Sequence, residues 1–421
     1  MNTKGNLPVC RFCNTPLTHT FVDLGMSPLC EDFVKPGKLN EMERFYPLHA
    51  YVCQECFLVQ LEEFVSPEVI YRDYPYFSSY SDSWLTHSKR YTDQIVSRFE
   101  IGADSLVAEL ASNDGYLLQF FNEKQIPVLG IEPAGTVAAR AREKGIRTEE
   151  YFFGNAVVEQ LTEKYGQPDL LIGNNVLAHV PDINDFVSAM KAYLKSNGVI
   201  TMEFPHLLKL IEGNQFDTIY HEHFSYLSFT TVNRIFEHHG LELFDVEELP
   251  THGGSLRIYA KHLKDATKQV SQAVGALLKR EREAGMTTIE YYSDFNRRVI
   301  NTKWNVLEFL ITAKRSGRTI AGYGAPGKAA TLLNYCGIRT DFIHYTVDRN
   351  PVKHGCYMAG THIPIFSPEK IRETRPDYVF ILPWNLKTEI MGSLSYIREW
   401  GGQFVVPIPE VTIFEPYPEL V

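Results

Sequence analysis

The fold class of this chain is decided by the segment Ser105-Leu-Val-Ala-Glu-Leu-Ala-Ser-Asn-Asp-Gly115 and the Tyr-Leu-Leu-Gln-Phe-Phe121 that follows it. The pattern predicts a buried strand that ends near the acid Glu109, then a short polar loop with glycine, then a helix. A second strand, residues 128–132, ends in another acid, Glu132, 23 positions after Glu109. This order is the first half of a nucleoside-binding α/β unit, in which the second acid accepts two ribose hydroxyls.

The loop after the first strand lacks the full Gly-x-Gly-x-x-Gly pattern that cradles a pyrophosphate. S-adenosylmethionine contains no phosphate, so the sequence favours this cofactor over a dinucleotide in the middle of the chain. We expect the loop at residues 109–116 to approach its methionine part and Glu132 to bind its ribose. The expected cofactor-binding residues are Glu109, Ala111, Asn113, Gly115, Glu132, Pro133 and Asn174.

The α/β pattern continues to about residue 262. A helix is predicted from about residue 83 to 98, a third buried strand with a polar end from 169, and a turn with another strand over 194–205. A helix at 230–239 is closed by Gly240, and residues 241–246 and 255–261 predict a closing antiparallel pair. This order resembles the class I methyltransferase fold.

Length and composition limit the possible classes of protein. A chain of 421 residues is long enough for two or three domains, and its 44% hydrophobic and 22% charged residues are ordinary for a globular protein. The net charge of −10 argues against nucleic acid as a partner, because nucleic-acid binding needs clustered Lys and Arg. No apolar run reaches the roughly 18 residues that span a bilayer, and the first residues lack the apolar core of a signal peptide. We expect a cytoplasmic protein without a membrane partner.

Four of the seven cysteines form two Cys-x-x-Cys pairs, Cys10 with Cys13 and Cys53 with Cys56. Each pair can present two thiolates to one metal, and four thiolates complete a tetrahedral structural zinc site with no open position for chemistry. A redox dithiol is the alternative, although one pair would suffice for it. The long gap between the pairs predicts a small subdomain, with a strand at 45–52 and a buried Cys30.

The C-terminal part contains Gly322-Tyr-Gly-Ala-Pro-Gly-Lys328 between a predicted strand and helix. This is a full Gly-x-Gly-x-x-Gly turn, and Asp348 ends the next predicted strand, residues 342–347, 21 positions beyond Gly327. By spacing alone it is a dinucleotide fingerprint, which makes an NAD(P)-dependent nucleotide-sugar oxidoreductase the alternative function. The same helix N-terminus could hold the diphosphate of a sugar nucleotide, or the domain could be structural. Residues 281–310 predict a linking helix, and residues 378–385 a later strand.

Across nearly its whole length the chain resembles the sugar C-methyltransferases of deoxysugar biosynthesis, which methylate C3′ of dTDP-4-keto-deoxysugars. The resemblance rests on the paired cysteines, Ser112-Asn-Asp-Gly-Tyr116, Tyr220-His-Glu-His-Phe-Ser-Tyr226, His252-Gly-Gly-Ser-Leu-Arg257 and the Gly-rich turn. One departure is Ala111, where methyltransferases usually carry the first glycine of the loop. Alanine is small, so we expect little effect, although it lacks the freedom of glycine at positive φ.

The resemblance implies C-methylation next to a ketone, through an enolate. His223 matches the family's proposed base, Tyr220 and Glu222 match its active-site partners, and His179 and Tyr74 match further substrate-side residues. The cluster is not a His-Glu-x-x-His zinc motif, because the second histidine follows the glutamate directly. The expected substrate is a nucleotide-diphosphate sugar, bound by His252, Arg257, Tyr323, Gly324, Gly327, Lys328 and Asp348.

The predicted architecture is therefore α/β with three parts. Residues 1–75 form a zinc-binding domain, residues 76–265 a Rossmann-like class I methyltransferase domain that uses S-adenosylmethionine, and residues 266–421 a linker helix with a C-terminal Rossmann-like domain for the sugar nucleotide. We expect a monomer or a small homo-oligomer.

Overall fold

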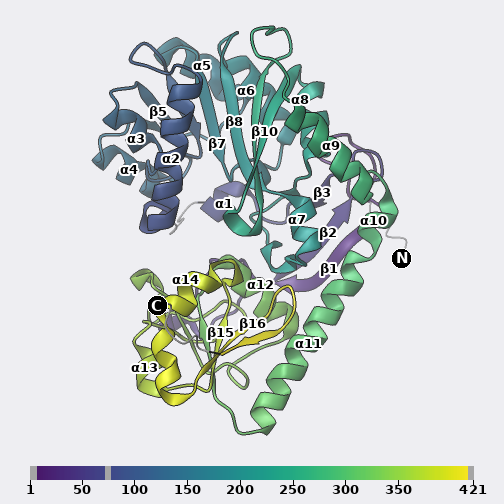
Figure 1. Ribbon diagram of the computed structural model, residues 1–421, viewed down its shortest axis with the longest axis vertical. Coiled ribbons are helices and arrows are strands. Elements are labelled where there is room, and N and C mark those ends of the chain that lie inside the picture. The colour runs from purple at the N-terminus through teal and green to yellow at the C-terminus, as the bar shows by residue number, and fades with distance from the viewer. Residues whose placement is uncertain (1–6, 72–76, 416–421) are drawn as a thin grey trace. The chain divides into compact units, whose positions relative to one another are not determined.

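The computed structural model describes residues 7–71 and 77–415 (Figure 1). The chain forms two compact units, each made of segments that are far apart in sequence. Unit 1 consists of Met1–Thr18, Cys53–Leu207 and Phe224–Ile289, and unit 2 of His19–Val52, Leu208–His223 and Glu290–Val421. The domain boundaries near residues 75 and 265 stay predictions.

A seven-stranded sheet forms the centre of unit 1, in the order β10-β11-β8-β7-β4-β5-β6. All its neighbouring pairs are parallel except those of β11, which runs antiparallel to β8 and β10. The strands are β4 (Val107–Leu110), β5 (Val128–Ile131), β6 (Thr148–Glu149), β7 (Leu170–Asn174), β8 (Val199–Pro205), β10 (Leu241–Leu249) and β11 (Ser255–His262). The predicted class I methyltransferase fold with its closing antiparallel pair is confirmed.

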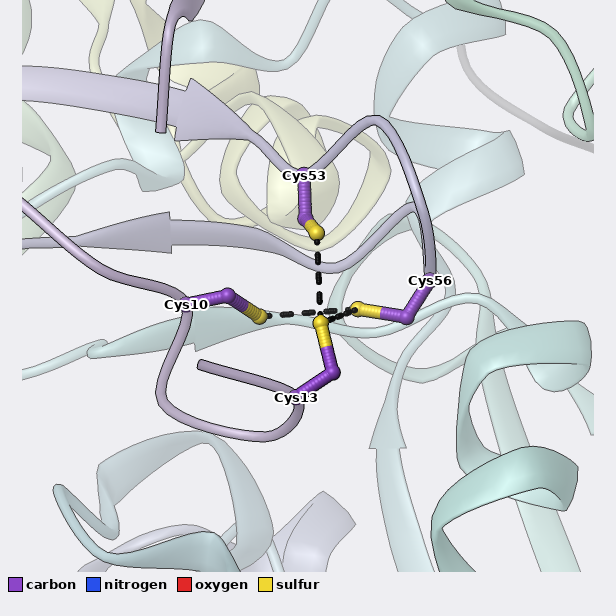
Figure 2. Close-up of side chains that lie close together, drawn as sticks. All are labelled: Cys10, Cys13, Cys53 and Cys56. Atoms are coloured by element: carbon purple, nitrogen blue, oxygen red, sulfur yellow. Dashed lines mark hydrogen bonds between the residues drawn. The ribbon is translucent and has the colours of Figure 1, made fainter. Parts of the chain in front are cut away.

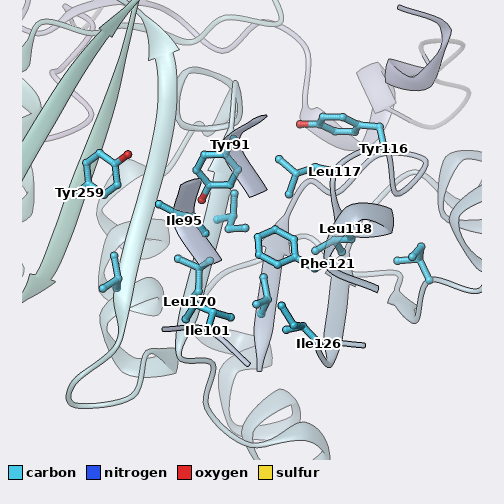
Figure 3. Close-up of a cluster of buried hydrophobic side chains, with 14 of the residues drawn as sticks. Tyr91, Ile95, Ile101, Tyr116, Leu117, Leu118, Phe121, Ile126, Leu170 and Tyr259 are labelled. Atoms are coloured by element: carbon cyan, nitrogen blue, oxygen red, sulfur yellow. The ribbon is translucent and has the colours of Figure 1, made fainter. Parts of the chain in front are cut away.

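Helices cover this sheet, and the long α2 begins where the sequence predicts it. The Ser81 hydroxyl accepts the N–H of Trp84 at its N-terminus, and Tyr91 and Ile95, four positions apart, point into the core. Figure 3 shows these side chains packed with Leu117, Phe121 and others in one apolar cluster. The helices of unit 1 include α1 (Pro67–Tyr71), α2 (Asp82–Arg98), α3 (Leu118–Glu123), α4 (Gly135–Glu143), α5 (Asn155–Tyr165), α6 (Ile183–Tyr193), α8 (Phe229–His238) and α9 (Gln272–Ala284).

The ends of parallel strands place the candidate site residues of unit 1. Because β4, β5, β7 and β8 are parallel, the loops that follow them leave from the same edge of the sheet. Two short strands, β3 (Val59–Leu61) and β9 (Ser225–Tyr226), pair antiparallel in the same unit. Among the described residues, no helix is long and apolar enough to cross a membrane.

Unit 2 contains a six-stranded sheet in the order β14-β13-β12-β15-β16-β17, in which β17 is antiparallel to β16 and the other pairs are parallel. An antiparallel pair of β1 (His19–Ser27) and β2 (Tyr46–Val52) packs on α11 and α12 through stacked rings such as Phe21 on Phe295. The remaining elements are β12 (Ile320–Tyr323), β13 (Thr346–Val347), β14 (Ile365–Phe366), β15 (Tyr378–Ile381), β16 (Gln403–Val406), β17 (Thr412–Phe414), α11 (Phe295–Arg315), α12 (Gly327–Cys336), α13 (Lys370–Thr374) and α14 (Lys387–Ser393). Two short helices, α7 (Leu207–Glu212) and α10 (Ile289–Ser293), lie where the chain passes between the units.

Three predicted elements differ from the structure. The strand predicted at 378–385 ends at Ile381 as β15, and a 3-10 helix begins at Trp384. The strand predicted at 342–347 shortens to β13, because the amides of Phe342 and Ile343 turn back to the carbonyl of Arg339. The linking helix predicted at 281–310 is interrupted, because α9 ends at Ala284 and the next residue, Gly285, adopts a left-handed conformation with φ of +96°.

Candidate active site and metal centre

Cys10, Cys13, Cys53 and Cys56 form one cluster, in which the four sulfur atoms lie within 4.8 Å of one another (Figure 2). The sulfur of Cys56 is 3.5 Å from that of Cys10 and 3.6 Å from that of Cys13. A tetrahedral zinc ion with Zn–S bonds of about 2.3 Å separates its thiolates by about 3.8 Å. The cluster therefore fits a structural zinc ion with four protein ligands.

The two Cys-x-x-Cys turns have the same backbone conformation. In each turn the residue after the second cysteine has a positive φ, +60° at Asn14 and +61° at Phe57, and its N–H returns to the carbonyl of the first cysteine. Gln60 donates from Nε2 to the Cys10 sulfur at 3.2 Å. Such outer hydrogen bonds orient metal-bound thiolates.

Glu109, at the end of β4, is fully buried, and its pKa is raised well above the ordinary range because burial disfavours the charged carboxylate. The Tyr116 hydroxyl is near enough to oppose this rise in pKa, but neither carboxylate oxygen has hydrogen-bond geometry with a described residue. The buried Nδ2 of Asn174, at the end of β7, also lacks such a partner in the described part of the chain. Buried polar groups of this kind need a partner, so this strand edge fits a polar cofactor such as S-adenosylmethionine.

Glu132, one residue beyond β5, links the loop after β4 to the loop after β5 by hydrogen bonds. Its two oxygens accept the N–H groups of Asn113 and Ala134, both at 2.9 Å. Burial raises the pKa of this carboxyl to about 7. Each oxygen has a second lone pair, so the carboxylate can still accept ribose hydroxyls. Pro133 lies between the two bonded positions.

The loop after β4 requires left-handed backbone at three positions, with φ of +53° at Ala111, +51° at Asn113 and +74° at Gly115. Asparagine and glycine adopt this conformation readily, whereas for alanine it costs about 1 kcal/mol or more. Ala111, which stands where methyltransferases usually have glycine, therefore has a strained backbone, and its small side chain does not relieve this strain.

His179 ends a 3-10 helix, Leu177–His179, in the loop after β7. Its Nδ1 lies 2.6 Å from the hydroxyl of Tyr71, and the two rings meet edge to face. Tyr71 therefore orients the His179 ring. Tyr74, the other residue predicted on this side, lies outside the described residues.

In unit 2, His223 is held by its own backbone turn. Its Nδ1 is 3.0 Å from the carbonyl oxygen of Thr218, and its N–H donates to the carbonyl of Tyr220. Because a carbonyl can only accept, Nδ1 carries the proton, and in the neutral ring Nε2 carries the lone pair. The ring centroid of Tyr220 lies 4.1 Å from that of His223, so the structure brings these two predicted residues together.

Glu222 does not join the contact between Tyr220 and His223, and its side chain is buried beside Cys30. Its Oε1 lies 3.4 Å from the sulfur of Cys30, which is buried as predicted. Burial, followed by the nearby Glu31, raises the pKa of Glu222 to about 8, while Lys353 opposes the rise. The carboxyl is therefore mostly protonated at pH 7.

The two substrate-binding residues predicted in unit 1 have protein partners. Arg257 is buried, and its guanidinium donates to Glu203 at 3.0 Å and to Glu247 at 3.2 Å. His252 has a positive φ of +53°, and its Nε2 lies 3.3 Å from Nδ2 of Asn175. The charge of Arg257 is thus balanced within the protein, and both substrate roles stay proposals.

The Gly-rich turn is lined by side chains of unit 2. The N–H of Ala325 donates to Asp348 at 2.7 Å. Burial raises the pKa of Glu31, and the nearby Lys353 and the N–H of Gly327 oppose this rise. A Cβ at Gly327 would lie 3.0 Å from the sulfur of Cys30 and 3.7 Å from a carboxylate oxygen of Glu31. The carboxyl group of Glu31 thus lies close to the N-terminus of α12, the position that favours anions.

The other predicted residues of this turn contact other residues of the protein. Tyr323, at the end of β12, is buried, and Gly324 has a φ of +91° with Pro383 against it. Lys328 donates to Asn385 at 2.7 Å and lies over the ring of Trp384, and burial lowers its pKa. These residues stay proposed as substrate contacts.

Three contributors to these sites were missed by the sequence reading. Thr218 acts through a backbone carbonyl, which leaves no signal in the sequence. Tyr71 and Glu31 are single polar residues whose partners lie far away along the chain. The only available signal for Tyr71 was its place in the tyrosine-rich stretch that also contains Tyr74.

Models of protein families match three parts of the chain. Residues 10–71 match a zinc binding domain, residues 84–246 a methyltransferase domain, and residues 250–409 a C-methyltransferase C-terminal domain. The C-methyltransferase NovU of Streptomyces niveus is 34% identical over 401 residues, which cover 95% of this chain and 95% of that protein. The chain belongs to the C-methyltransferase family.

This C-methyltransferase uses S-adenosylmethionine, and its four-cysteine cluster is the site for zinc. Among solved structures, an S-adenosylmethionine-dependent methyltransferase from Clostridium acetobutylicum is 12% identical, with 42% of this chain and 92% of that chain covered and a TM-score of 0.36. Magnesium protoporphyrin IX methyltransferase from Synechocystis is 14% identical, with 42% and 82% covered and a TM-score of 0.34.

Proposed function

We propose that this C-methyltransferase acts on a nucleotide-linked 4-keto-deoxysugar, such as a dTDP-sugar, and methylates C3′ during deoxysugar biosynthesis. The observation that carries the proposal is the bond from Nδ1 of His223 to the carbonyl of Thr218. It leaves the lone pair of the neutral ring on Nε2, as a general base requires. Imidazole titrates near neutral pH, which suits removal of a weakly acidic C–H proton.

In the proposed reaction, Nε2 of His223 takes the proton from C3′, and the electron pair of that C–H bond forms the enolate of the 4-ketone. Tyr220, whose ring lies against that of His223, donates a hydrogen bond to the enolate oxygen. Glu222, mostly protonated at pH 7, adds little negative charge near the base. S-adenosylmethionine, when bound, would supply the methyl group as an electrophile, and the electron pair of the broken S–CH3 bond would stay on the sulfur of S-adenosylhomocysteine. C3′ would take the methyl group with inversion at the methyl carbon.

The cofactor side of the proposal rests on Glu132, the loop after β4 and the buried Glu109. Glu132 accepts the ribose hydroxyls, and the loop lies against the methionine part. His179, oriented by Tyr71, acts on the substrate side together with Tyr74. The zinc ion takes no part in the chemistry, because its four ligands are all protein thiolates.

Hydrogen exchange into the substrate tests the base directly. The wild-type enzyme, with S-adenosylhomocysteine bound and in deuterium oxide, is expected to exchange the C3′ proton of a dTDP-4-keto-deoxysugar. His223→Ala is expected to lose both exchange and methylation. His221→Asn is the matched control, because the ring of His221 is buried and contacts the carbonyl of Pro47.

The exchange results show whether His223 or another residue is the base. Near-normal exchange in His223→Ala would assign the base to another residue, with His179 or a tyrosine next in line. Loss of exchange in both variants would show that the whole segment, and not the His223 ring, is required. No exchange in the wild type with any keto sugar would reject the substrate class.

We also propose that the diphosphate binds at the N-terminus of α12, where it has to displace the carboxylate of Glu31. Glu31→Ala is therefore expected to tighten binding of dTDP, measured by calorimetry, whereas an unchanged affinity would mean that the diphosphate is held elsewhere. The alternative NAD(P)-dependent oxidoreductase would place a dinucleotide at this turn. Tight binding of NADH with no binding of any nucleotide sugar would support that alternative.

A further inference from the structure

Arg11 lies inside the first zinc turn, between Cys10 and Cys13, and its side chain reaches away from the metal. Its Nη1 donates to the carbonyl of Pro181 at 2.6 Å, and its Nη2 donates to the carbonyl of Leu61. The guanidinium also lies 5.5 Å from the ring centroid of Phe224. One side chain thus joins three segments of unit 1.

Two of these segments adjoin the candidate catalytic histidines. Pro181 is two residues after His179, in the loop between β7 and α6. Phe224 directly follows His223 in the chain, and its carbonyl accepts the N–H of Leu61 at 3.0 Å. The contacts of Arg11 therefore hold the backbone of the loop after His179 and pack on the ring of Phe224 within unit 1.

The position of Arg11 is itself set by the zinc turn. The Arg11 N–H donates to Oε1 of Gln60 at 2.9 Å, and Nε2 of the same Gln60 donates to the Cys10 sulfur at 3.2 Å. Asn184, at the start of α6, donates to the carbonyls of Arg11 and Phe12. A tetrahedral zinc site holds both cysteine turns, so it also holds the backbone from which Arg11 projects.

We propose that Arg11 is a positioning residue, which transmits the geometry of the zinc turn to the loop that carries His179. For its effect on catalysis, this inference rests on the proposed role of His179. The metal then contributes to the reaction by ordering the active-site loop, although it touches no reacting atom.

The chemistry of the side chain explains why arginine is needed. The planar guanidinium can donate to two carbonyls at once while one face packs on an aromatic ring. Burial lowers its pKa to about 10, so it remains charged at neutral pH. Lysine can carry the charge but cannot hold two carbonyls in a fixed fork, and methionine can only fill the space.

The test compares Arg11→Met and Arg11→Lys with a matched control, Arg234→Met. Arg234 contacts the second zinc turn in a similar way, since it donates to the carbonyl of Glu55 at 3.0 Å and lies over the ring of Phe57. Its side chain is exposed, and these contacts do not include the loop after β7. The control therefore removes a contact with the zinc site and leaves the Arg11 contacts intact.

Hydrogen–deuterium exchange, zinc content and kinetics are measured on each full-length variant. Arg11→Met is expected to keep about one zinc ion per chain and an S-adenosylmethionine affinity within about twofold of the wild type. Amides at 176–183 are expected to exchange about tenfold faster, while those of α5 do not change. The value of kcat is expected to fall about 10²-fold, the size reported for small misplacements of reacting groups, with KM little changed.

The remaining outcomes each decide a point. Arg11→Lys is expected to lie between the wild type and Arg11→Met, and it serves if Arg11→Met does not fold. Three results would each overturn the positioning role. They are unchanged amide exchange at 176–183 in zinc-loaded Arg11 variants, loss of zinc from these variants, and the same changes in Arg234→Met. If amide exchange in the loop is faster but kcat is normal, the structural link between Arg11 and the loop is supported, and its effect on catalysis is rejected. The exchange measurement needs no sugar substrate, so it stands apart from the proposed function.

Discussion

Gly130, in the middle of β5, allows the cofactor loop to lie directly against the strand. A Cβ at this position would lie 2.4 Å from the hydroxyl oxygen of Ser112, 3.1 Å from its Cβ and 3.0 Å from the hydroxyl oxygen of Thr148. The contact of 2.4 Å cannot be kept, and the Ser112 Cβ at 3.1 Å stays tight even if the hydroxyl turns away, so Gly130→Ala is expected to shift Ser112 and strain the loop. Overpacking of this kind costs about 1–3 kcal/mol.

The displaced loop is the one expected to approach S-adenosylmethionine, so the affinity for the cofactor is expected to fall about tenfold, or about 1.4 kcal/mol. Calorimetric titration and thermal unfolding measure the two effects. The double variant Gly130→Ala with Ser112→Ala removes the closest contact and is expected to recover most of both losses. Ser112→Ala alone is the control, since the Ser112 hydroxyl has no partner among the described residues. Normal affinity and stability in Gly130→Ala, or no rescue by the second change, would refute the reasoning.

Three other predictions concern the cofactor, the pH dependence and the metal. Glu132→Ala is expected to weaken S-adenosylmethionine binding by about 1.5–3 kcal/mol, the value for hydrogen bonds to a charged group, and unchanged binding in calorimetry would remove this assignment. Because the pKa of Glu222 is raised to about 8 in the folded chain, its contribution to stability is present below about pH 4.5 and is lost as the pH rises through about 8. Glu222→Gln is therefore expected to lose less thermal stability than the wild type between pH 5 and pH 9, and equal losses would contradict the raised pKa. Metal analysis is expected to find about one zinc ion per chain and much less in Cys53→Ser, with a lower Tm, whereas full stability of protein shown to be metal-free would exclude a structural role.

The strand-end acids and the cysteine pairs could be predicted because short spacings determine their positions. Glu109 and Glu132 end neighbouring parallel strands, so their backbone positions follow from the strand pattern alone. Two residues between cysteines force a tight turn, and two such turns suggest one metal. These features depend on local sequence, which a single chain displays directly.

The surroundings of the catalytic candidates could not be predicted in the same way. The partner of His223 is the carbonyl of Thr218, and a carbonyl has the same chemistry at every position of a chain. Arg11 stands between the two cysteines of the first pair, and nothing in its sequence neighbourhood indicates Pro181, 170 positions away. The Gly-rich turn predicts a ligand site, and the position of Glu31 beside it depends on packing between segments that are far apart in the sequence.

The division of the chain has a practical consequence for dissecting the enzyme. The polypeptide passes from one unit to the other after Thr18, Val52, Leu207, His223 and Ile289. No single proteolytic cut therefore separates one whole unit from the other, because even a cut after Ile289, which keeps unit 1 whole, leaves it joined to two segments of unit 2. Exchange of one unit with a related enzyme would require several segments to be transplanted together, so relatives with altered specificity are easier to obtain by point substitution than by splicing whole modules.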